Sequence, residues 1–148
     1  MKIVVAETEQ AIAACFPVMF ELRPHLIQET FVERIRQQQS QGYRLAYLEL
    51  TGEPTGEVSG QPVALAGFRI SNNLAWGKFL YVDDLVTSAK HRSHGYGKAL
   101  LNWLNEYAIQ EGCSQLHLDS GVQRKEAHRF YQREQVIVTG FHFARNLK

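Results

Sequence analysis

A basic loop with two glycines carries the clearest chemical signal in this sequence. Residues 85–100 read L-V-T-S-A-K-H-R-S-H-G-Y-G-K-A-L. A helix that starts at Gly95 leaves its first amide groups without helical partners, and its dipole adds partial positive charge there. Glycine lets an anion approach the backbone closely, and Lys90, Arg92 and Lys98 add full charges nearby. The pattern therefore predicts a phosphate-binding site.

Two nucleotide-binding motifs fit this loop less well. Gly95 and Gly97 satisfy the first part of a dinucleotide fingerprint, but Leu100 stands where its third small residue belongs. The spacing of a nucleoside-triphosphate loop is absent too. The purely structural alternative is a glycine-rich helix start with basic residues on its surface.

Two adjacent carboxylates come just before the loop. Asp83 and Asp84 lie in the stretch Lys78–Thr87, whose β-branched and aromatic residues predict a strand. Because successive strand side chains point to opposite faces, only one of the two is expected to face a cleft. Such a carboxylate could accept a proton from a reacting group. The alternative is a structural aspartate at a β-bulge.

The histidines give weaker signals. His117 and His128 each lack a second ligand at metal-binding spacing, so no metal site is predicted. His91 and His94 flank Arg92, where they either contact a phosphate or belong to a solvated loop.

Hydrophobic periodicity predicts the elements that position these residues. The expected helices are Thr8–Leu22, kinked or divided at Pro17, then Ile27–Gln39, Gly95–Glu111 and Arg124–Arg133. The expected strands are Met1–Ala6, Tyr43–Leu50, Pro62–Ile70, Lys78–Thr87 and Gln115–Ser120, with one or two more in Val136–Phe143. We expect a hairpin loop at Thr51–Gln61 and a turn at Asn72 and Asn73. This order predicts an α/β fold with a mixed central sheet flanked by about four helices.

Length and composition exclude several classes of protein. The 148 residues suit a single domain, 1–148, and 45% hydrophobic residues predict a buried core. A net charge of +1 gives no general case for binding nucleic acid or an anionic membrane. The apolar run Ala11–Phe20 is broken by Pro17 and is shorter than the ~18 residues of a membrane span. With no signal-peptide pattern, and with Cys15 and Cys113 interpreted as reduced thiols, a cytoplasmic location is expected.

At the glycine loop the sequence resembles the GCN5-related N-acetyltransferases (GNAT family). Arg92-Ser93-His94-Gly95-Tyr96-Gly97 fits the R/Q-x-x-G-x-G/A pyrophosphate loop of that family, after the strand end Leu85-Val86-Thr87. The later A-H-R-F-Y, Ala127–Tyr131, is similar to the A-x-x-x-Y stretch of the family's last helix. The sequence departs from the family where Arg124 replaces a frequent asparagine and Gln135-Val136 replaces a Gly-Phe pair.

The resemblance implies an N-acetyltransferase that uses acetyl-CoA as acetyl donor and no metal. It places the pyrophosphate on the amides of His94–Lys98, with Arg92 and Ser93 beside them. It sets the pantetheine arm along Leu85, Val86 and Thr87, with Arg124 and Ala127 also in contact. In this picture an N–H at or next to Leu85 polarises the thioester carbonyl. Asp83 serves as the base, directly or through water, and Tyr131 as the acid that protonates the leaving thiolate.

The acceptor implied is a small-molecule amine bound between the first two helices and the terminal strands. The side chains that could receive a cationic amine are Glu21, His25, Gln28, Glu29, Asp83 and Asp119. They favour a small cationic amine, such as a polyamine, an aminoglycoside or an amino-acid-like molecule, over a protein tail. The alternatives are a non-catalytic acyl-CoA sensing domain, a protein N-acetyltransferase and a nucleotide-binding module. The terminal strands also suggest a homodimer.

Overall fold

The computed structural model describes residues 1–51 and 60–148, which form two compact units, residues 1–117 and 118–148. Most of the hairpin loop expected at Thr51–Gln61 lies outside the described residues. The helices are α1 (Glu9–Ala14), α2 (Phe16–Leu22), α3 (Gln28–Gln39), α4 (Tyr96–Gln110) and α5 (Lys125–Arg133), with a short 3-10 helix η1 (Ala89–His91). The strands are β1 (Lys2–Val5), β2 (Tyr43–Glu49), β3 (Pro62–Asn73), β4 (Gly77–Thr87) and β5 (Gln115–Leu118).

The strands form one sheet in the order β1-β2-β3-β4-β5. The first four are joined by antiparallel ladders. Strands β4 and β5 are neighbours connected through α4, and such a helical crossover is the connection that a parallel pair requires. The predicted α/β fold with a mixed sheet is confirmed.

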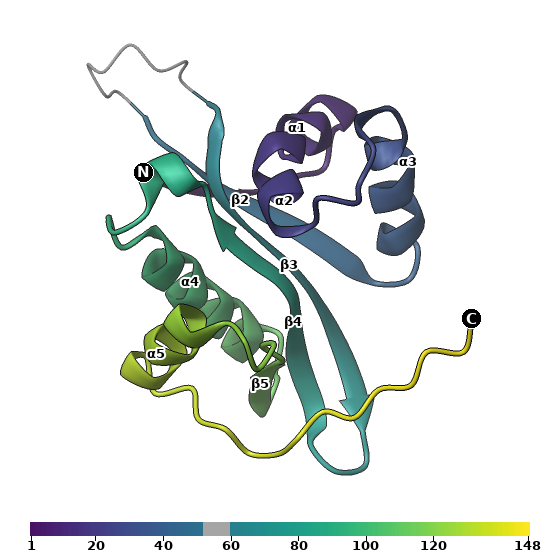
Figure 1. Ribbon diagram of the computed structural model, residues 1–148, viewed down its shortest axis with the longest axis vertical. Helices are drawn as coiled ribbons and strands as arrows, with labels where there is room; N and C mark the ends of the chain where they lie inside the picture. Colours follow the sequence, from purple (N-terminus) through teal and green to yellow (C-terminus); the bar gives the residue numbers. More distant parts are fainter. Residues whose placement is uncertain (52–59) are drawn as a thin grey trace. The chain divides into compact units, whose positions relative to one another are not determined.

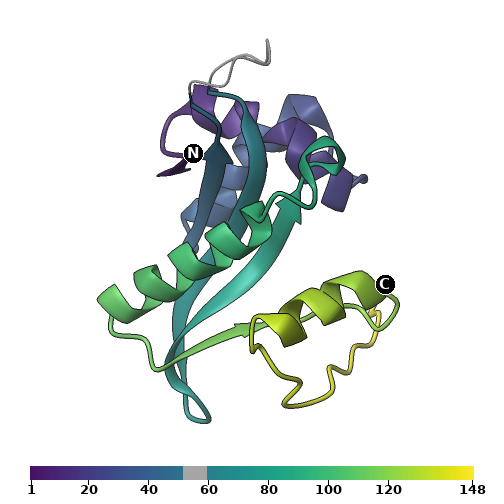
Figure 2. The same ribbon diagram turned by 90° about the vertical axis from the view of Figure 1, so that its left-hand side faces the viewer.

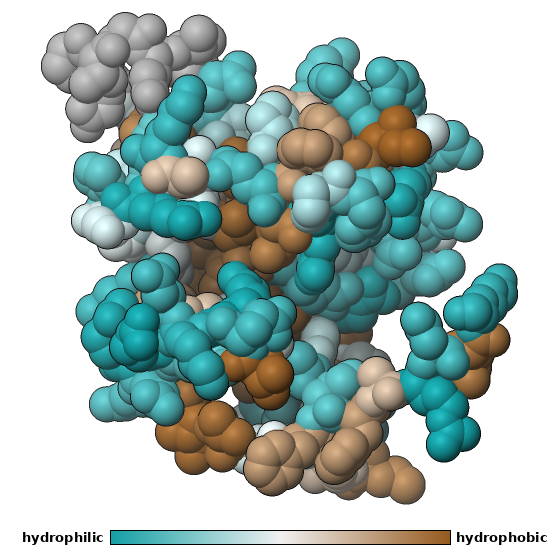
Figure 3. Space-filling model, in the orientation of Figure 1, coloured by the Kyte–Doolittle hydropathy of each residue, from teal (hydrophilic) through white to brown (hydrophobic). Residues whose placement is uncertain are grey.

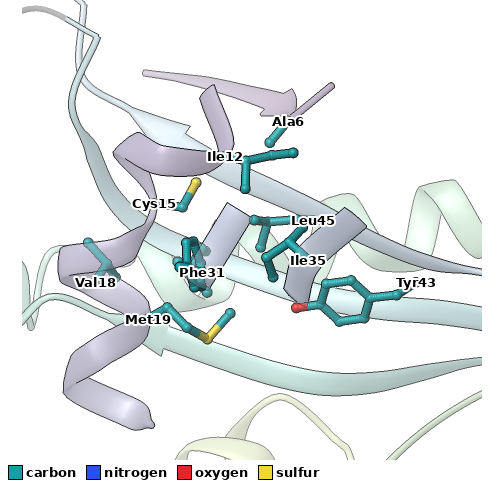
Figure 4. Close-up of a cluster of buried hydrophobic side chains, with 10 residues drawn as sticks. Ala6, Ile12, Cys15, Val18, Met19, Phe31, Ile35, Tyr43 and Leu45 are labelled. Carbon is teal, nitrogen blue, oxygen red and sulfur yellow. The ribbon is translucent and has the colours of Figure 1, made fainter. Parts of the chain in front are cut away.

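Helices cover both faces of the sheet in the first unit, with α1, α2 and α3 on one face and α4 on the other (Figures 1 and 2). Beneath the first three helices lies a buried cluster of Ala6, Ile12, Cys15, Val18, Met19, Phe31, Ile35, Tyr43, Leu45 and Leu65 (Figure 4). On the other face, the Phe68 ring packs edge-on against Trp103 at 5.9 Å and Tyr107 at 5.1 Å between ring centroids. The sheet is therefore buried on both sides where β3 crosses its centre.

Local signals explain where the helices begin and end. The hydroxyl of Thr8 accepts a hydrogen bond from the Ala11 N–H at 3.1 Å and caps α1. Pro17 lies in the first turn of α2, where its missing N–H costs no helical bond, so it divides the predicted Thr8–Leu22 helix as expected. Helix α4 ends before Gly112, which adopts the left-handed conformation with φ +77°.

The turn after β3 lies later than the sequence pattern predicts. Asn72 and Asn73 pair with Lys78 and Gly77 in the β3–β4 ladder, so placing the turn at these asparagines was wrong. The Asn73 side chain still directs the turn, because its Oδ1 accepts from the Trp76 N–H at 2.7 Å. An asparagine at the last strand position thus builds the turn that follows it.

The second unit, residues 118–148, contains α5 and an extended C-terminal segment. No residue from 134 to 148 belongs to a helix or strand, so the strand prediction for Val136–Phe143 was wrong. Apolar content indicates burial, whereas a strand also needs a partner for its backbone groups. The Val136 N–H instead donates back to the Tyr131 carbonyl at 2.9 Å. The exposed apolar side chains of this segment are Ile137, Val138, Phe141, Phe143 and Leu147. Figure 3 shows apolar side chains on the surface among polar ones.

Among the described residues, no helix has both the length and the apolar character that a membrane span requires.

Candidate active site

The glycine loop has the backbone conformation of an anion-binding turn. It runs from the end of β4 at Thr87, through η1, to the first residue of α4, Tyr96. Ser93 and Gly95 both adopt positive φ angles, +65° and +79°, a left-handed conformation that occurs in anion-binding turns. No side chain caps the start of α4. The first helical amides, at Tyr96 and Gly97, have no partner within the helix and can therefore bind an anion.

The His94 side chain forms hydrogen bonds within this loop. Its Nδ1 lies 2.7 Å from the Arg92 carbonyl and 3.1 Å from the His91 carbonyl. Since carbonyl oxygens only accept, Nδ1 carries the hydrogen and donates it to them. The imidazole also stacks on the Tyr96 ring at 5.6 Å between centroids. His94 thus stabilises the curvature of the loop.

Helix α2 is tied to the start of the loop. The carboxylate of Glu21 accepts a hydrogen bond from the Ala89 N–H at 2.8 Å. This contact joins the helix after Pro17 to the segment that follows β4. Glu21, predicted as an acceptor-binding residue, therefore has a structural contact of its own.

Among the strands that the structure describes, only β3 pairs with the end of β4, which leaves the other backbone edge open. The Ser88 N–H donates to the Val63 carbonyl at 2.8 Å, so Ser88 and Val86, two residues apart, direct their backbone groups toward β3. Leu85 and Thr87 direct theirs to the opposite edge. Strand β5 is short and begins beside Lys78, where the Ser114 N–H donates to the Lys78 carbonyl at 2.8 Å.

Strand lengths keep β5 away from this edge. At roughly 3.3 Å per residue, the four residues of β5 reach about 13 Å from that point. Leu85 lies seven residues beyond Lys78 along β4, or about 23 Å. The groups of Leu85 and Thr87 are therefore not paired by β5.

A β-bulge changes the direction of the two carboxylates. In the β3–β4 ladder Gly67 pairs with Asp84 and Phe68 with Val82, so Asp83 is an extra residue on β4. The expectation that Asp83 and Asp84 point to opposite faces was wrong, because the bulge breaks the alternation of side chains. Both carboxylates instead join one hydrogen-bonded network.

Asp84 forms the inner half of this network. Its Oδ1 accepts from Arg23 Nε at 2.9 Å, and its Oδ2 accepts from the Tyr43 hydroxyl at 2.9 Å. Burial, followed by the charge of Asp84, raises the pKa of Tyr43 well above its usual value. Tyr43 therefore stays protonated and keeps donating to Asp84. The side chain of Asp84 is only 12% exposed, as expected for a structural carboxylate.

Asp83 forms the outer half. Both of its carboxylate oxygens accept from Arg69, with distances of 2.8 to 3.2 Å to Nε and Nη2. Arg23 links the two halves, because its Nη2 donates to the Asp83 carbonyl at 3.0 Å. The Arg69 guanidinium also lies 5.6 Å from the centre of the Tyr43 ring.

Gly67 makes room for this arrangement. A Cβ on Gly67 would overlap the Tyr43 hydroxyl and lie 2.7 Å from Asp84 Oδ2. The hydrogen bond between Tyr43 and Asp84 therefore occupies the space that a side chain would take. Sequence reasoning missed Arg23, Tyr43, Gly67 and Arg69, because up to 61 residues separate the partners and no local pattern links them.

The remaining candidates of the second unit lie on or next to α5. Tyr131 is buried, and this burial raises the pKa of its phenol, against a smaller lowering effect of Arg124. Arg124 precedes the helix and accepts from the His128 N–H through its carbonyl at 3.1 Å. Ala127 lies four residues before Tyr131 and so shares its side of the helix.

The other predicted acceptor residues fall into two groups. His25, Gln28 and Glu29 are exposed around the start of α3. Asp119 belongs to the second unit, where one of its carboxylate oxygens lies 3.4 Å from His142 Nδ1. Within residues 1–51 and 60–148, no group of three or more His, Cys, Asp or Glu side chains is arranged to hold a metal ion.

Comparison with known proteins shows which family the chain resembles. A family model described as "Acetyltransferase (GNAT) family" matches residues 6–135. An uncharacterised N-acetyltransferase of Bacillus subtilis, YhdJ, is 39% identical over 121 residues, covering 80% of this chain and 79% of its own. The aminoalkylphosphonate N-acetyltransferase of Salmonella typhimurium is 35% identical over 66 residues, covering 45% of this chain and 43% of its own.

The fold is shared with solved structures as well. A structure described as a putative acetyltransferase from Agrobacterium tumefaciens superposes with a TM-score of 0.78 at 21% identity, covering 98% of this chain and all of that one.

Proposed function

The chain belongs to the GNAT family of acetyltransferases, and we propose that it transfers the acetyl group of acetyl-CoA directly to a small-molecule amine while both are bound. It is an acyltransferase of the N-acetyltransferase class, as its relatives are. The donor, the acceptor and the residue roles given below are parts of the proposal.

One observation carries the proposal. The open backbone edge of β4 at Leu85 and Thr87 leads directly into the anion-binding loop before α4. The open amides suit a pyrophosphate and the extended edge suits an amide-containing arm, so the residues fit acetyl-CoA. We propose that it is held by Leu85, Val86, Thr87, Arg92, Ser93, His94, Gly95, Tyr96, Gly97 and Lys98, and in the second unit by Arg124 and Ala127.

The chain supplies proton transfer and fixed dipoles to this reaction, and acetyl-CoA supplies the acetyl group when bound. The acceptor nitrogen must lose a proton before it can attack, since an alkylamine with a pKa near ~10.4 is mostly charged at neutral pH. The proton passes to Asp83, while the Leu85 N–H donates to the acyl oxygen. The new C–N bond replaces the C–S bond, and the leaving sulfur takes its proton from Tyr131. The nitrogen loses a second proton as the amide forms, and this proton replaces the one that Tyr131 gave.

The surroundings of both proposed catalytic groups support these roles. Asp83 already accepts hydrogen bonds from Nε and Nη2 of Arg69, so its remaining lone pairs serve the amine, and a bridging water gives the short side chain the necessary reach. The raised pKa of Tyr131 keeps its phenol protonated, which a proton donor requires.

The acceptor is proposed to be a small amine that is cationic in solution. The aminoalkylphosphonate enzyme among its relatives is named for a small molecule that carries an amino group, which supports a small-molecule amine as the acceptor. We further propose that the protein works in the cytoplasm, where the free thiols Cys15 and Cys113 stay reduced.

A two-stage experiment tests the proposal. In a thermal-shift screen, acetyl-CoA is expected to raise the melting temperature, whereas ATP and NAD are not. Release of free CoA is then measured with a panel of amines. Stabilisation by ATP or NAD alone would favour a nucleotide-binding module. Stabilisation by acetyl-CoA without turnover of any amine would favour an acyl-CoA sensing domain, and turnover of peptide amines alone would favour a protein N-acetyltransferase.

A further inference from the structure

The network around Asp83 is electrically balanced. It contains two guanidinium groups, Arg23 and Arg69, and two carboxylates, Asp83 and Asp84, connected by hydrogen bonds of 2.8 to 3.2 Å. The uncharged Gln38 of α3 completes it by accepting from Arg69 at 2.9 Å. A cationic acceptor alone would leave this partly buried group with excess positive charge. An acceptor that is neutral overall would preserve the balance.

The two halves of the network differ in access to solvent. The side chain of Asp83 is 26% exposed and that of Arg23 is 43% exposed, whereas Asp84 is nearly covered. A molecule that approaches from solvent therefore meets a carboxylate and a guanidinium together. The two lie close, since Arg23 Nη2 is 3.0 Å from the carbonyl oxygen of the Asp83 residue itself.

Arg23 retains hydrogen-bonding capacity beyond these contacts. A guanidinium carries five N–H groups in a planar fork. The contacts with Asp84 and Asp83 engage one N–H on Nε and one on Nη2. The other N–H groups lie on a side chain that is 43% exposed as a whole. They suit a carboxylate or a phosphonate, which guanidinium binds with charge-assisted hydrogen bonds.

We propose that the acceptor is an amine that also carries an anionic group, with the amine at Asp83 and the anion at Arg23. The inference rests on the proposed acetyltransferase function and narrows its acceptor class. It excludes polyamines and aminoglycosides as preferred acceptors, because they bring several positive charges to a balanced site.

Matched pairs of amines test the proposal. Each amino acid is compared with the amine left when its carboxylate is removed, for example lysine with 1,5-diaminopentane. Each aminoalkylphosphonate is compared with the corresponding alkylamine, which separates the two anions. For at least one pair, kcat/KM of the anionic member is expected to be about tenfold higher or more, a factor typical of one charge-assisted contact.

Substitution of Arg23 assigns the effect to that residue. Arg23→Gln is expected to raise KM for the anionic member, because the anion loses its guanidinium. KM of the partner amine is expected to fall, because the substitution leaves the network with an excess negative charge, so the preference for the anionic member is lost or reversed. A merely structural role would affect both members equally. Arg23→Lys keeps the charge and is expected to restore part of the preference. Arg34→Gln makes the same chemical change at an exposed position of α3 and should leave the preference intact.

If the Arg23 variants do not fold, inhibition of the wild-type protein tests whether the site binds an anion. The carboxylic or phosphonic acid that lacks the amine is expected to inhibit competitively against the anionic acceptor. Turnover of amines with no preference in any pair overturns the inference and leaves the acetyltransferase function intact. A preference that Arg23→Gln leaves unchanged overturns the role of Arg23. Absence of turnover with every amine overturns the proposed function, and the inference with it.

Discussion

Asp83 and Asp84 are chemically identical neighbours with different surroundings. Asp84 is held by a helix arginine and a buried tyrosine, and Asp83 by a strand arginine with part of its side chain in solvent. A base needs access to its substrate, and a scaffold needs fixed partners. These contacts favour Asp83 as the carboxylate that reacts. Asp84 instead holds Arg23 in position.

The role of Tyr131 is tested by removing only its hydroxyl. Tyr131→Phe is expected to lower kcat more than tenfold and leave acetyl-CoA binding nearly unchanged, because the ring that packs near Phe130 is kept. Steady-state kinetics and a binding titration give the two values. Turnover at the wild-type level would exclude Tyr131 as the acid.

Gly67 is expected to tolerate no side chain. Gly67→Ala places a methyl group where the Tyr43 hydroxyl meets Asp84, and such overpacking costs about 1–3 kcal/mol. Chemical denaturation should show this loss in the free energy of unfolding. Gly140→Ala is the control, since a Cβ there meets no atom within 4 Å. Equal stability of the two variants would show that the space under Tyr43 is not needed.

The two cysteines are expected to differ in reactivity. Burial raises the pKa of the Cys15 thiol to about 12, and its Sγ donates to the Ala11 carbonyl at 3.3 Å. At pH 8 only about one molecule in ten thousand then carries the Cys15 thiolate, the reactive form. A thiol reagent should modify Cys113 first and Cys15 only on unfolding. Rapid modification of both thiols in the native state would contradict this order.

At the scale of elements, the sequence predicts regular structure better than its interruptions. Helix α4 follows from the periodic apolar residues of its core face, and Pro17 signals the division between α1 and α2. The bulge at Asp83 was only an alternative interpretation of the two aspartates, because an extra residue in a ladder depends on how the partner strand pairs. The residues around the carboxylates escaped sequence reasoning for this reason.

The loop before α4 is tested by a change of backbone conformation. Gly95→Ala meets no steric obstacle, but φ of +79° strains any residue with a side chain. We expect a stability loss of about 1 kcal/mol and a higher KM for acetyl-CoA. Gly112→Ala, at the other end of α4 with φ of +77°, is the matched control. It should cost similar stability and leave that KM unchanged, whereas an equal KM effect would exclude a local role of the loop.

At the scale of the whole molecule, the net charge of +1 gave little information. The network around Asp83 is balanced and adds nothing to the total, and the basic residues of the loop are offset by acidic residues elsewhere among the 15 Asp and Glu. What the sequence could predict was the family and the loop that precedes α4, since these depend on consecutive residues, whereas phosphate binding by that loop stays a prediction. The net charge describes the average surface of the protein. It therefore says nothing about the charge of an individual binding site.

The C-terminal segment is expected to be covered by a second copy of the chain. Its exposed apolar residues include Phe141 and Phe143, each at least 86% exposed. Light scattering should give twice the mass of the 16.9 kDa chain. Replacing both phenylalanines with serine should shift the protein toward monomer. Leu74→Ser, at a fully exposed residue of the β3–β4 turn, should not. A monomeric wild-type protein would refute the homodimer.

The open edge of β4 also has a consequence for solubility. A strand edge with unpaired amides and carbonyls can recruit the edge of another molecule and begin aggregation. Here the bulge at Asp83 twists the strand just before the open stretch, and two ionised side chains stand beside it. The twist and the two charged side chains both hinder the addition of a flat strand to this edge. A short extended ligand that contacted only Leu85–Thr87 would not meet either of them. The bulge therefore protects the edge as well as directing the carboxylates.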